Sequence, residues 1–145
     1  MKNLILTLFL SVVALTTVQS QVQFGTGIDT DFGELGIAGK AKFNVVDKWG
    51  GQVGFSWFLN SPNASRLDLD ATYQLTTAGD NDAISLKGLG GLNYWSSGVP
   101  QAGGELGVNI GANVTFPISD RIFYLEPRIT IISNSAFFVG AGTYF

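Results

Sequence analysis

The sequence contains no cysteine and no histidine, and it has few charged residues. Only 13% of its 145 residues are charged, whereas a soluble domain typically has about 25%. Without cysteine the chain has no disulfide, thiol nucleophile, thiolate zinc site or lipoprotein anchor, and without histidine it lacks the commonest general base and metal ligand. The net charge of −3 gives no electrostatic reason to expect nucleic-acid binding. The low charge indicates that much of the surface does not face water.

Only one long apolar run is present, and it lies at the start of the chain. Lys2 precedes an almost continuous apolar run from Leu4 to Leu15, and Val18 and Ser20 place small residues just before Gln21. This is the layout of a secretory signal peptide, and the run is shorter than the roughly 20 residues that a membrane-spanning helix needs. We expect a signal peptide over 1–20, cleaved near Ser20/Gln21, and one mature domain over 21–145.

Apolar side chains then recur at every second position, which is typical of strands with one apolar face. This alternation predicts eight strands, over 22–28, 35–45, 53–59, 67–75, 84–94, 106–116, 123–131 and 137–145. Turn-forming residues separate the strands, with turns expected at 47–51 and 117–120 among others. No helix is expected. Pro127 lies inside a strand without an N–H to donate, which predicts a bulge there.

The two faces of these strands differ in charge, and the difference indicates which face meets lipid. The apolar face carries no charge, whereas the opposite face is largely glycine and small polar residues. Eight charged residues also lie on that opposite face: Lys40, Lys42, Asp68, Asp70, Lys87, Glu105, Glu126 and Arg128. Exposing a lysine to the bilayer midplane costs about 2–4 kcal/mol. The sequence therefore predicts an all-β, eight-stranded antiparallel up-and-down transmembrane β-barrel with a polar lumen.

The lumen of such a barrel is just wide enough to be filled by side chains. Charges in that space must be paired, because breaking a buried pair costs about 3–5 kcal/mol. We therefore interpret the eight charges as a structural ion network that plugs the barrel, with Asp70 and Lys87 as the expected pair. The alternative is a narrow ion pore, or a conduit for small apolar molecules suggested by Phe58, Leu89 and Phe138 at lumen positions.

Aromatic residues gather at the ends of the predicted strands. With the chain starting in the periplasm, one set falls near the periplasmic ends and another near the opposite ends. The first set is Phe24, Phe43, Tyr73, Phe116, Phe123 and Phe145, and the second is Trp57, Tyr94 and Phe137. Two aromatic belts around an apolar band are typical of membrane barrels.

The end of the chain, F-F-V-G-A-G-T-Y-F over 137–145, has a terminal Phe145 with Gly140 five residues before it. It resembles the carboxy-terminal β-signal by which outer-membrane barrels are recognised for assembly. Residues 87–94, 105–112 and 116–120 resemble later strands of small porin-family barrels of the OmpA/OmpX type. This resemblance implies a monomeric barrel in the outer membrane of a Gram-negative bacterium, and no cofactor is expected. It also implies contact with membrane lipid and lipopolysaccharide, with the outer-membrane assembly machinery and with periplasmic chaperones.

No catalytic site is predicted. Asp68 and Asp70 share a strand face, but carboxylates beside lysines favour salt bridges over acid–base chemistry. Asp29, Asp31 and Glu34 near the first hairpin either bind a divalent cation or are solvated turn residues, and the sequence leaves both open. Two function classes remain: a non-catalytic barrel that serves outer-membrane structure or surface interaction, and a transport protein.

Overall fold

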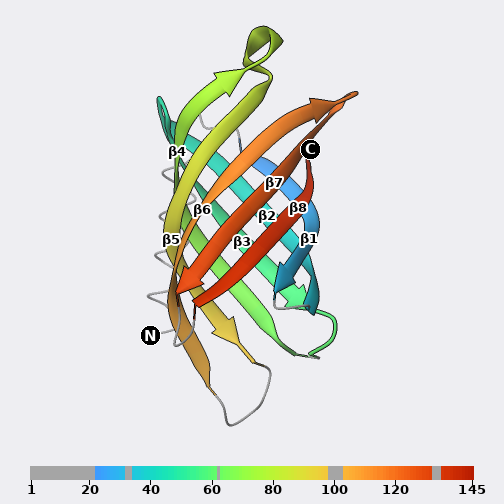
Figure 1. Cartoon of the computed structure of the whole chain (residues 1–145), viewed down its shortest axis with the longest axis vertical. Coiled ribbons are helices and arrows are strands. Elements are labelled where there is room, and N and C mark those ends of the chain that lie inside the picture. The colour runs from blue at the N-terminus through green and yellow to red at the C-terminus, as the bar shows by residue number, and fades with distance from the viewer. Residues whose placement is uncertain (1–21, 32–33, 62, 98–102, 132–134) are drawn as a thin grey trace.

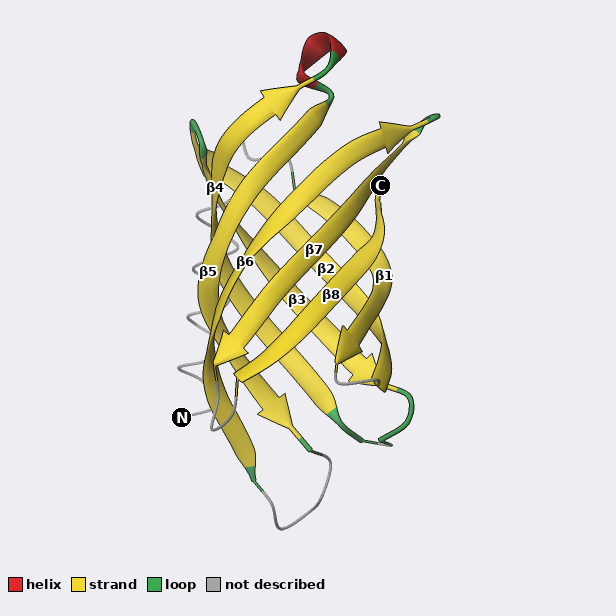
Figure 2. Cartoon of the chain, viewed as in Figure 1, coloured by secondary structure: helices red, strands yellow, loops and turns green. Residues whose placement is uncertain are grey.

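Eight antiparallel strands make up almost all of the computed structural model, which describes residues 22–31, 34–61, 63–97, 103–131 and 135–145 (Figures 1 and 2). The strands are β1 (Gln23–Asp31), β2 (Glu34–Val46), β3 (Trp49–Phe58), β4 (Ser65–Ala78), β5 (Ile84–Ser96), β6 (Gly104–Ile118), β7 (Arg121–Ile131) and β8 (Ser135–Tyr144). The predicted signal peptide lies outside the described residues. No helix in the described part of the chain is long and apolar enough to cross a membrane.

Each strand pairs with the next along the chain, and β1 also pairs with β8, so the sheet closes into a barrel. The closing pair places Thr26 opposite Thr143 and Asp31 opposite Phe138. β1 begins and β8 ends at the same end of the barrel (Figure 1), which we call the terminal end; the opposite end is the loop end. The predicted eight-stranded up-and-down topology is confirmed.

Side chains alternate between the outside and the inside of the barrel. Ile37, Leu69 and Ile110 on the outside are 55%, 57% and 58% exposed, while Ala38 and Asp68, each beside one of them in sequence, are 1% exposed. Most of the large apolar groups therefore form the outer surface, and the buried charged groups lie in the lumen. This is the inside-out arrangement that the charge pattern predicts, and it suits a barrel surrounded by lipid.

The turns at the terminal end are tighter than the sequence indicates. β3 already begins at Trp49, because the chain reverses within residues 47–48 with Asp47 in a left-handed conformation (φ 47°). Trp49 then lies opposite Tyr73 on β4, with ring centroids 4.8 Å apart. Likewise β6 continues through Ile118, so the predicted 117–120 turn shortens to 119–120. A 3-10 turn over Asp80–Asp82, η1, was not expected.

Pro127 interrupts the hydrogen bonding of β7 with β6 but does not shift its register. Gly111 lies opposite Arg128 and Val114 opposite Leu125, and these pairs belong to one continuous register with an unpaired gap between them. The predicted bulge is therefore wrong, because losing one donor breaks the ladder locally without inserting a residue. The register shifts lie elsewhere, at Asn44/Val46 and at Gln74/Thr76.

Candidate functional site: the barrel lumen

The middle of the lumen holds a cluster of charged side chains that come from β1, β2, β4 and β7. All of its members are at most 5% exposed: Asp29, Lys40, Arg66, Asp68, Asp70, Glu126 and Arg128. We call these residues the lumen cluster. Burial of this many charges requires close pairing, because removing one partner of a buried pair lowers the stability of the fold by about 3–5 kcal/mol.

Two arginines connect the carboxylates of the cluster. Arg66 donates from Nη2 to Asp29 Oδ2 at 2.5 Å and from Nε to Asp68 Oδ2 at 2.9 Å. Arg128 Nη1 lies 2.9 Å from Asp68 Oδ2 and 3.6 Å from Asp70 Oδ2. Asp68 therefore lies between the two guanidinium groups. Their planar, rigid geometry holds Asp29, Asp68 and Asp70 in one arrangement, and Arg128 also contacts Glu126.

Glu126 is the second junction of the cluster. It accepts a hydrogen bond from Lys40 Nζ at 2.6 Å and another from Arg128 Nη2. The amides of Gln52 and Asn113 donate to its other oxygen at 3.1 and 2.7 Å. Four donors on one carboxylate compensate for the loss of water, since hydrogen bonds to a charged group are stronger than those between neutral groups.

Amide groups also serve the remaining carboxylates. Asn109 Nδ2 lies 2.9 Å from Asp68 Oδ1 and 3.1 Å from Asp70 Oδ1, and Gln52 donates to Asp70 Oδ2 at 3.1 Å. Asn109 itself accepts from Asn93 at 2.7 Å. The cluster has four carboxylates and three cations, a net charge of −1, and these neutral donors stabilise the excess negative charge.

Aromatic rings lie beyond the lumen cluster toward both ends of the barrel. Toward the loop end, Phe58 packs on Trp95 with ring centroids 4.8 Å apart, and the guanidinium carbon of Arg66 lies 4.2 Å from the centre of the Phe138 ring. Toward the terminal end, Tyr124 and Tyr144 pack together with ring centroids 4.8 Å apart. Cations over ring faces are attracted by the ring quadrupole, so the rings also contact the charges between them.

Small residues inside the barrel leave the space that these rings occupy. A Cβ at Gly25 would lie 2.6 Å from Tyr144 Cδ1, and a Cβ at Gly27 would lie 2.5 Å from the Tyr124 hydroxyl. A Cβ at Gly36 would lie 3.1 Å from the Phe58 ring. Gly25 and Gly36 are therefore matched to large side chains of the neighbouring strands, and Gly27 to one from β7, two strands away.

The structure brings five of the eight predicted lumen charges together: Lys40, Asp68, Asp70, Glu126 and Arg128. The other three lie nearer the barrel ends. Glu105 is exposed because β6 begins only at Gly104, so its position is on the rim. Lys42 and Lys87 line the mouth of the barrel at the terminal end.

The predicted pairing of Asp70 with Lys87 is wrong. Asp70 lies opposite Gly91 on β5, whereas Lys87 lies further along, opposite Gln74. Asp70 instead faces Arg128, which reaches it across the lumen from β7. Alternation places both residues on the lumen face, but contacts across the lumen between strands distant in the sequence depend on strand tilt and side-chain length.

The sequence interpretation missed two members of the lumen cluster, Asp29 and Arg66. It assigned Asp29 to the first hairpin, although Asp29 follows the alternation of β1 and points inward to Arg66 and to Ser56, whose hydroxyl lies 2.6 Å away. Arg66 occupies the lumen position directly before Leu67, the first residue of the apolar face of β4. Extending each alternation to the strand ends would have found both.

Asp29 and Glu34, which the sequence places together near the first hairpin, have separate partners in the structure. Glu34 accepts a hydrogen bond from the Ser61 hydroxyl at 2.6 Å, and Asp29 is bound inside the barrel. In the part of the chain that the structure describes, no group of three or more His, Cys, Asp or Glu residues is arranged to hold a metal ion.

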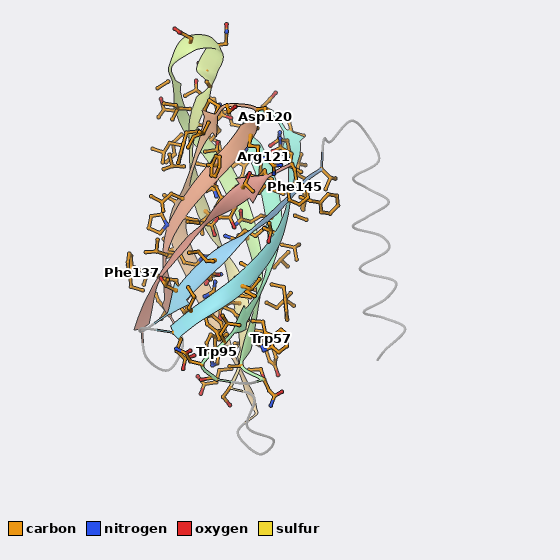
Figure 3. The ribbon with its side chains drawn as sticks, turned by 90° about the vertical axis from the view of Figure 1, so that its right-hand side faces the viewer. Trp57, Trp95, Asp120, Arg121, Phe137 and Phe145 are labelled. Atoms are coloured by element: carbon orange, nitrogen blue, oxygen red, sulfur yellow. The ribbon has the colours of Figure 1, made fainter. Side chains whose placement is uncertain are left out.

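Outward-facing aromatic side chains lie toward both ends of the apolar exterior, as Figure 3 shows for Phe145 near the terminal end and Trp57 near the loop end. The members at the terminal end are Phe24, Phe43, Trp49, Tyr73, Phe116, Phe123 and Phe145, and those at the loop end are Trp57, Tyr94 and Phe137. The interpretation of 47–51 as a turn missed Trp49. Phe145 is 72% exposed, and its N–H donates to the Phe24 carbonyl at 2.9 Å.

No protein-family profile and no curated protein matches this sequence. Among solved structures, the chain is similar to the N-terminal β-barrel domain of OprF from Pseudomonas aeruginosa, with a TM-score of 0.62 and 16% identity over 88% of this chain and 100% of that one. It is also similar to a designed transmembrane β-barrel (TM-score 0.57, 14% identity, 86% of this chain and 94% of that one). A third similar structure is the outer membrane protein Ail from Yersinia pestis (TM-score 0.55, 15% identity, 88% and 100%).

These similarities and the geometry above define the class of protein. The chain has the fold of the small eight-stranded transmembrane β-barrels. The predicted resemblance to barrels of the OmpA/OmpX type is thereby confirmed at the level of the fold.

Proposed function

We propose that the chain is a non-catalytic, non-conducting barrel of the outer membrane of a Gram-negative bacterium, inserted as a monomer. Its role is in outer-membrane structure or surface interaction, in contact with membrane lipid and lipopolysaccharide. The outer-membrane location is supported by the apolar exterior with its aromatic ends, by the OprF and Ail similarities, and by the predicted signal peptide.

The observation that carries the closed-lumen proposal is the burial of the lumen cluster. Arg66, Asp29 and Glu126 have no solvent-accessible surface, and Arg128 is 1% exposed. An ion entering the lumen would have to separate these pairs, at about 3–5 kcal/mol for each one broken. The ring pairs toward either end further restrict entry to the lumen.

The absence of a catalytic role is supported by residue types. The sequence has no histidine or cysteine, and the carboxylates of the lumen are bound to arginine, lysine and amide groups. These carboxylates are also buried, whereas a general base must lie within hydrogen-bond reach of the substrate proton that it removes.

Assembly is proposed to depend on β8, whose last residues carry the predicted β-signal. Gly140 lies on the lumen face, where an added Cβ would lie 2.9 Å from Asp29 Oδ1, while Phe145 lies outside near the terminal end. The recognition partners are the outer-membrane assembly machinery and periplasmic chaperones. Replacing Phe145 by Ser should lower the amount of barrel inserted in vivo without altering refolding of purified protein into detergent.

Single-channel recording in planar bilayers tests the closed lumen. The native protein should add no steady conductance, whereas a variant in which Arg66 and Arg128 are both replaced by Ala should conduct if it still folds. An R121A variant, which changes an exposed arginine of the terminal end, controls for loss of charge alone. Steady conductance by the native barrel would contradict the proposal and favour a narrow pore.

A further inference from the structure

Two lysines of the barrel interior have no carboxylate partner. In the described part of the chain neither Lys42 nor Lys87 takes part in an ion pair, whereas the neighbouring Lys40 is bound to Glu126 at 2.6 Å. Lys42 Nζ lies 4.1 Å from the centre of the Tyr144 ring, and Lys87 Nζ lies 3.2 Å from Asn44 Oδ1. Two positive charges are therefore held by neutral groups only.

Both lysines line one small cavity at the terminal end. Its volume is about 10 Å³, close to the space that a single water-sized oxygen needs. The remaining lining residues are Phe43, Asn44, Gln52, Thr72 and Asn113. The cavity thus combines two cations with amide and hydroxyl groups and contains no acidic residue.

The nearest carboxylate of the lumen cluster does not neutralise these lysines. Glu126 already accepts from Lys40, Arg128, Gln52 and Asn113. Gln52 and Asn113 are also cavity-lining residues, so their amide N–H groups are committed to Glu126. Lys42 and Lys87 consequently repel each other in a partly buried space, and an anion between them would turn that repulsion into attraction.

The position of the cavity indicates the type of anion. Phe43, which lines it, belongs to the outward aromatic residues of the terminal end, and aromatic residues of membrane barrels mark the level of the lipid headgroups. Lysine binds phosphate as a flexible point charge. We propose that Lys42 and Lys87 form a binding site for one phosphate group, with one phosphate oxygen in the cavity. The group belongs either to a lipid headgroup at this membrane surface or to free phosphate.

The experiment is a titration of the folded full-length mature barrel, 15N-labelled, in a phosphate-free nonionic detergent at constant ionic strength. Inorganic phosphate is added in place of chloride, and the side-chain amide signals of Asn44 and Asn113 are followed by NMR. Saturable shifts are expected. K42Q and K87Q should each weaken binding by roughly tenfold, the loss of one hydrogen bond to a charged group. K48Q, at an exposed lysine in the neighbouring turn, should titrate like the native protein.

A second arm identifies the source of the phosphate. The same samples are titrated with a short-chain phosphatidylglycerol; tighter binding than inorganic phosphate assigns the site to a lipid headgroup, and weaker binding assigns it to free phosphate. Far-UV circular dichroism and heat-modifiable gel migration check that each variant is folded. Absence of saturable shifts with both probes, or equal titrations for folded K42Q, K87Q and native protein, would overturn the proposal.

Discussion

Arg128 faces three carboxylates of the lumen cluster, and replacing it by Met tests whether the paired charges stabilise the barrel. The substitution keeps a long side chain but removes the charge that faces Asp68, Asp70 and Glu126. The cluster then has four carboxylates and two cations, a net charge of −2. We expect strong destabilisation without a change of fold.

The size of the effect follows from the partners that remain. Breaking a buried pair costs about 3–5 kcal/mol, but Asp68 keeps Arg66, and Glu126 keeps Lys40. The expected loss is therefore near the lower limit, about 3 kcal/mol. With a urea dependence of about 2 kcal/mol/M, the unfolding midpoint should fall by roughly 1.5 M. The assay is equilibrium urea unfolding in lipid vesicles, followed by tryptophan fluorescence.

A double-mutant cycle with Asp70 separates pairing from packing. Asp70 Oδ2 lies 3.6 Å from Arg128 Nη1, and Asp70 also accepts from the amides of Gln52 and Asn109. Because this ion pair is long, D70N alone should lower the free energy of unfolding by only about 1 kcal/mol. The R128M/D70N double variant restores the net charge of −1 and should be more stable than the sum of the single effects by about 1 kcal/mol or more. Additive effects would refute the pairing.

Other predictions concern space and position inside the barrel, and the same unfolding assay measures them. Gly25→Ala should destabilise by about 1–3 kcal/mol, because its Cβ would lie 2.6 Å from Tyr144 Cδ1, whereas Gly39→Ala, with nothing within 4 Å of the new Cβ, should change stability by less than about 0.5 kcal/mol. Equal effects would show that the lumen is not tightly packed at this end. Glu126→Gln should cost about 3 kcal/mol because it leaves buried Lys40 without a carboxylate, while Glu105→Gln on the exposed rim should stay within about 0.5 kcal/mol. A large loss for Glu105→Gln would contradict its placement outside the packed lumen.

The fold was predictable from the sequence because the period-two alternation indicates both the strands and the face of each strand that contacts lipid. Positions such as Ile37 and Leu69 give the apolar face, and the absence of charge from that face indicates contact with lipid. A register slip of one residue would expose Lys40 to the bilayer, so the alternation also fixes the register. Closure of β8 on β1 follows from the need to pair every strand edge in a membrane.

The composition of the lumen cluster was only partly predictable. Alternation assigns Asp68 and Arg128 to the lumen but gives no distance between strands that are not sequence neighbours, so the contact of Asp70 with Arg128 was not found. Asp29 and Arg66 were missed because both lie near strand ends, where polar residues fit a turn as well as they fit the lumen face of a strand. Glu105 shows the opposite error. Its place in the alternation assigns it to the lumen face, but it lies at the end of a strand and is exposed.

The matching of glycines to aromatic rings was invisible in the sequence for a related reason. Gly27 lies on β1, and the Tyr124 hydroxyl that approaches it comes from β7. Lumen packing thus pairs small and large residues from strands that are far apart in the sequence, where neither spacing nor local propensity applies. The lumen-facing glycines were counted as small interior residues, but what fills the space beside them required coordinates.

The most direct test of a filled, ion-paired lumen is the exchange of arginine guanidinium protons with water. The chain contains three arginines: Arg66 and Arg128 are 0% and 1% exposed, while Arg121 lies exposed at the terminal end (Figure 3). In a 15N-arginine-labelled barrel at neutral pH, NMR should show slowly exchanging Nη2 protons for Arg66 and Arg128, which donate to Asp29 and Glu126, and fast exchange for Arg121, because protons held in buried hydrogen bonds are protected. Fast exchange at all three arginines would mean that water reaches the middle of the lumen and would contradict the closed barrel.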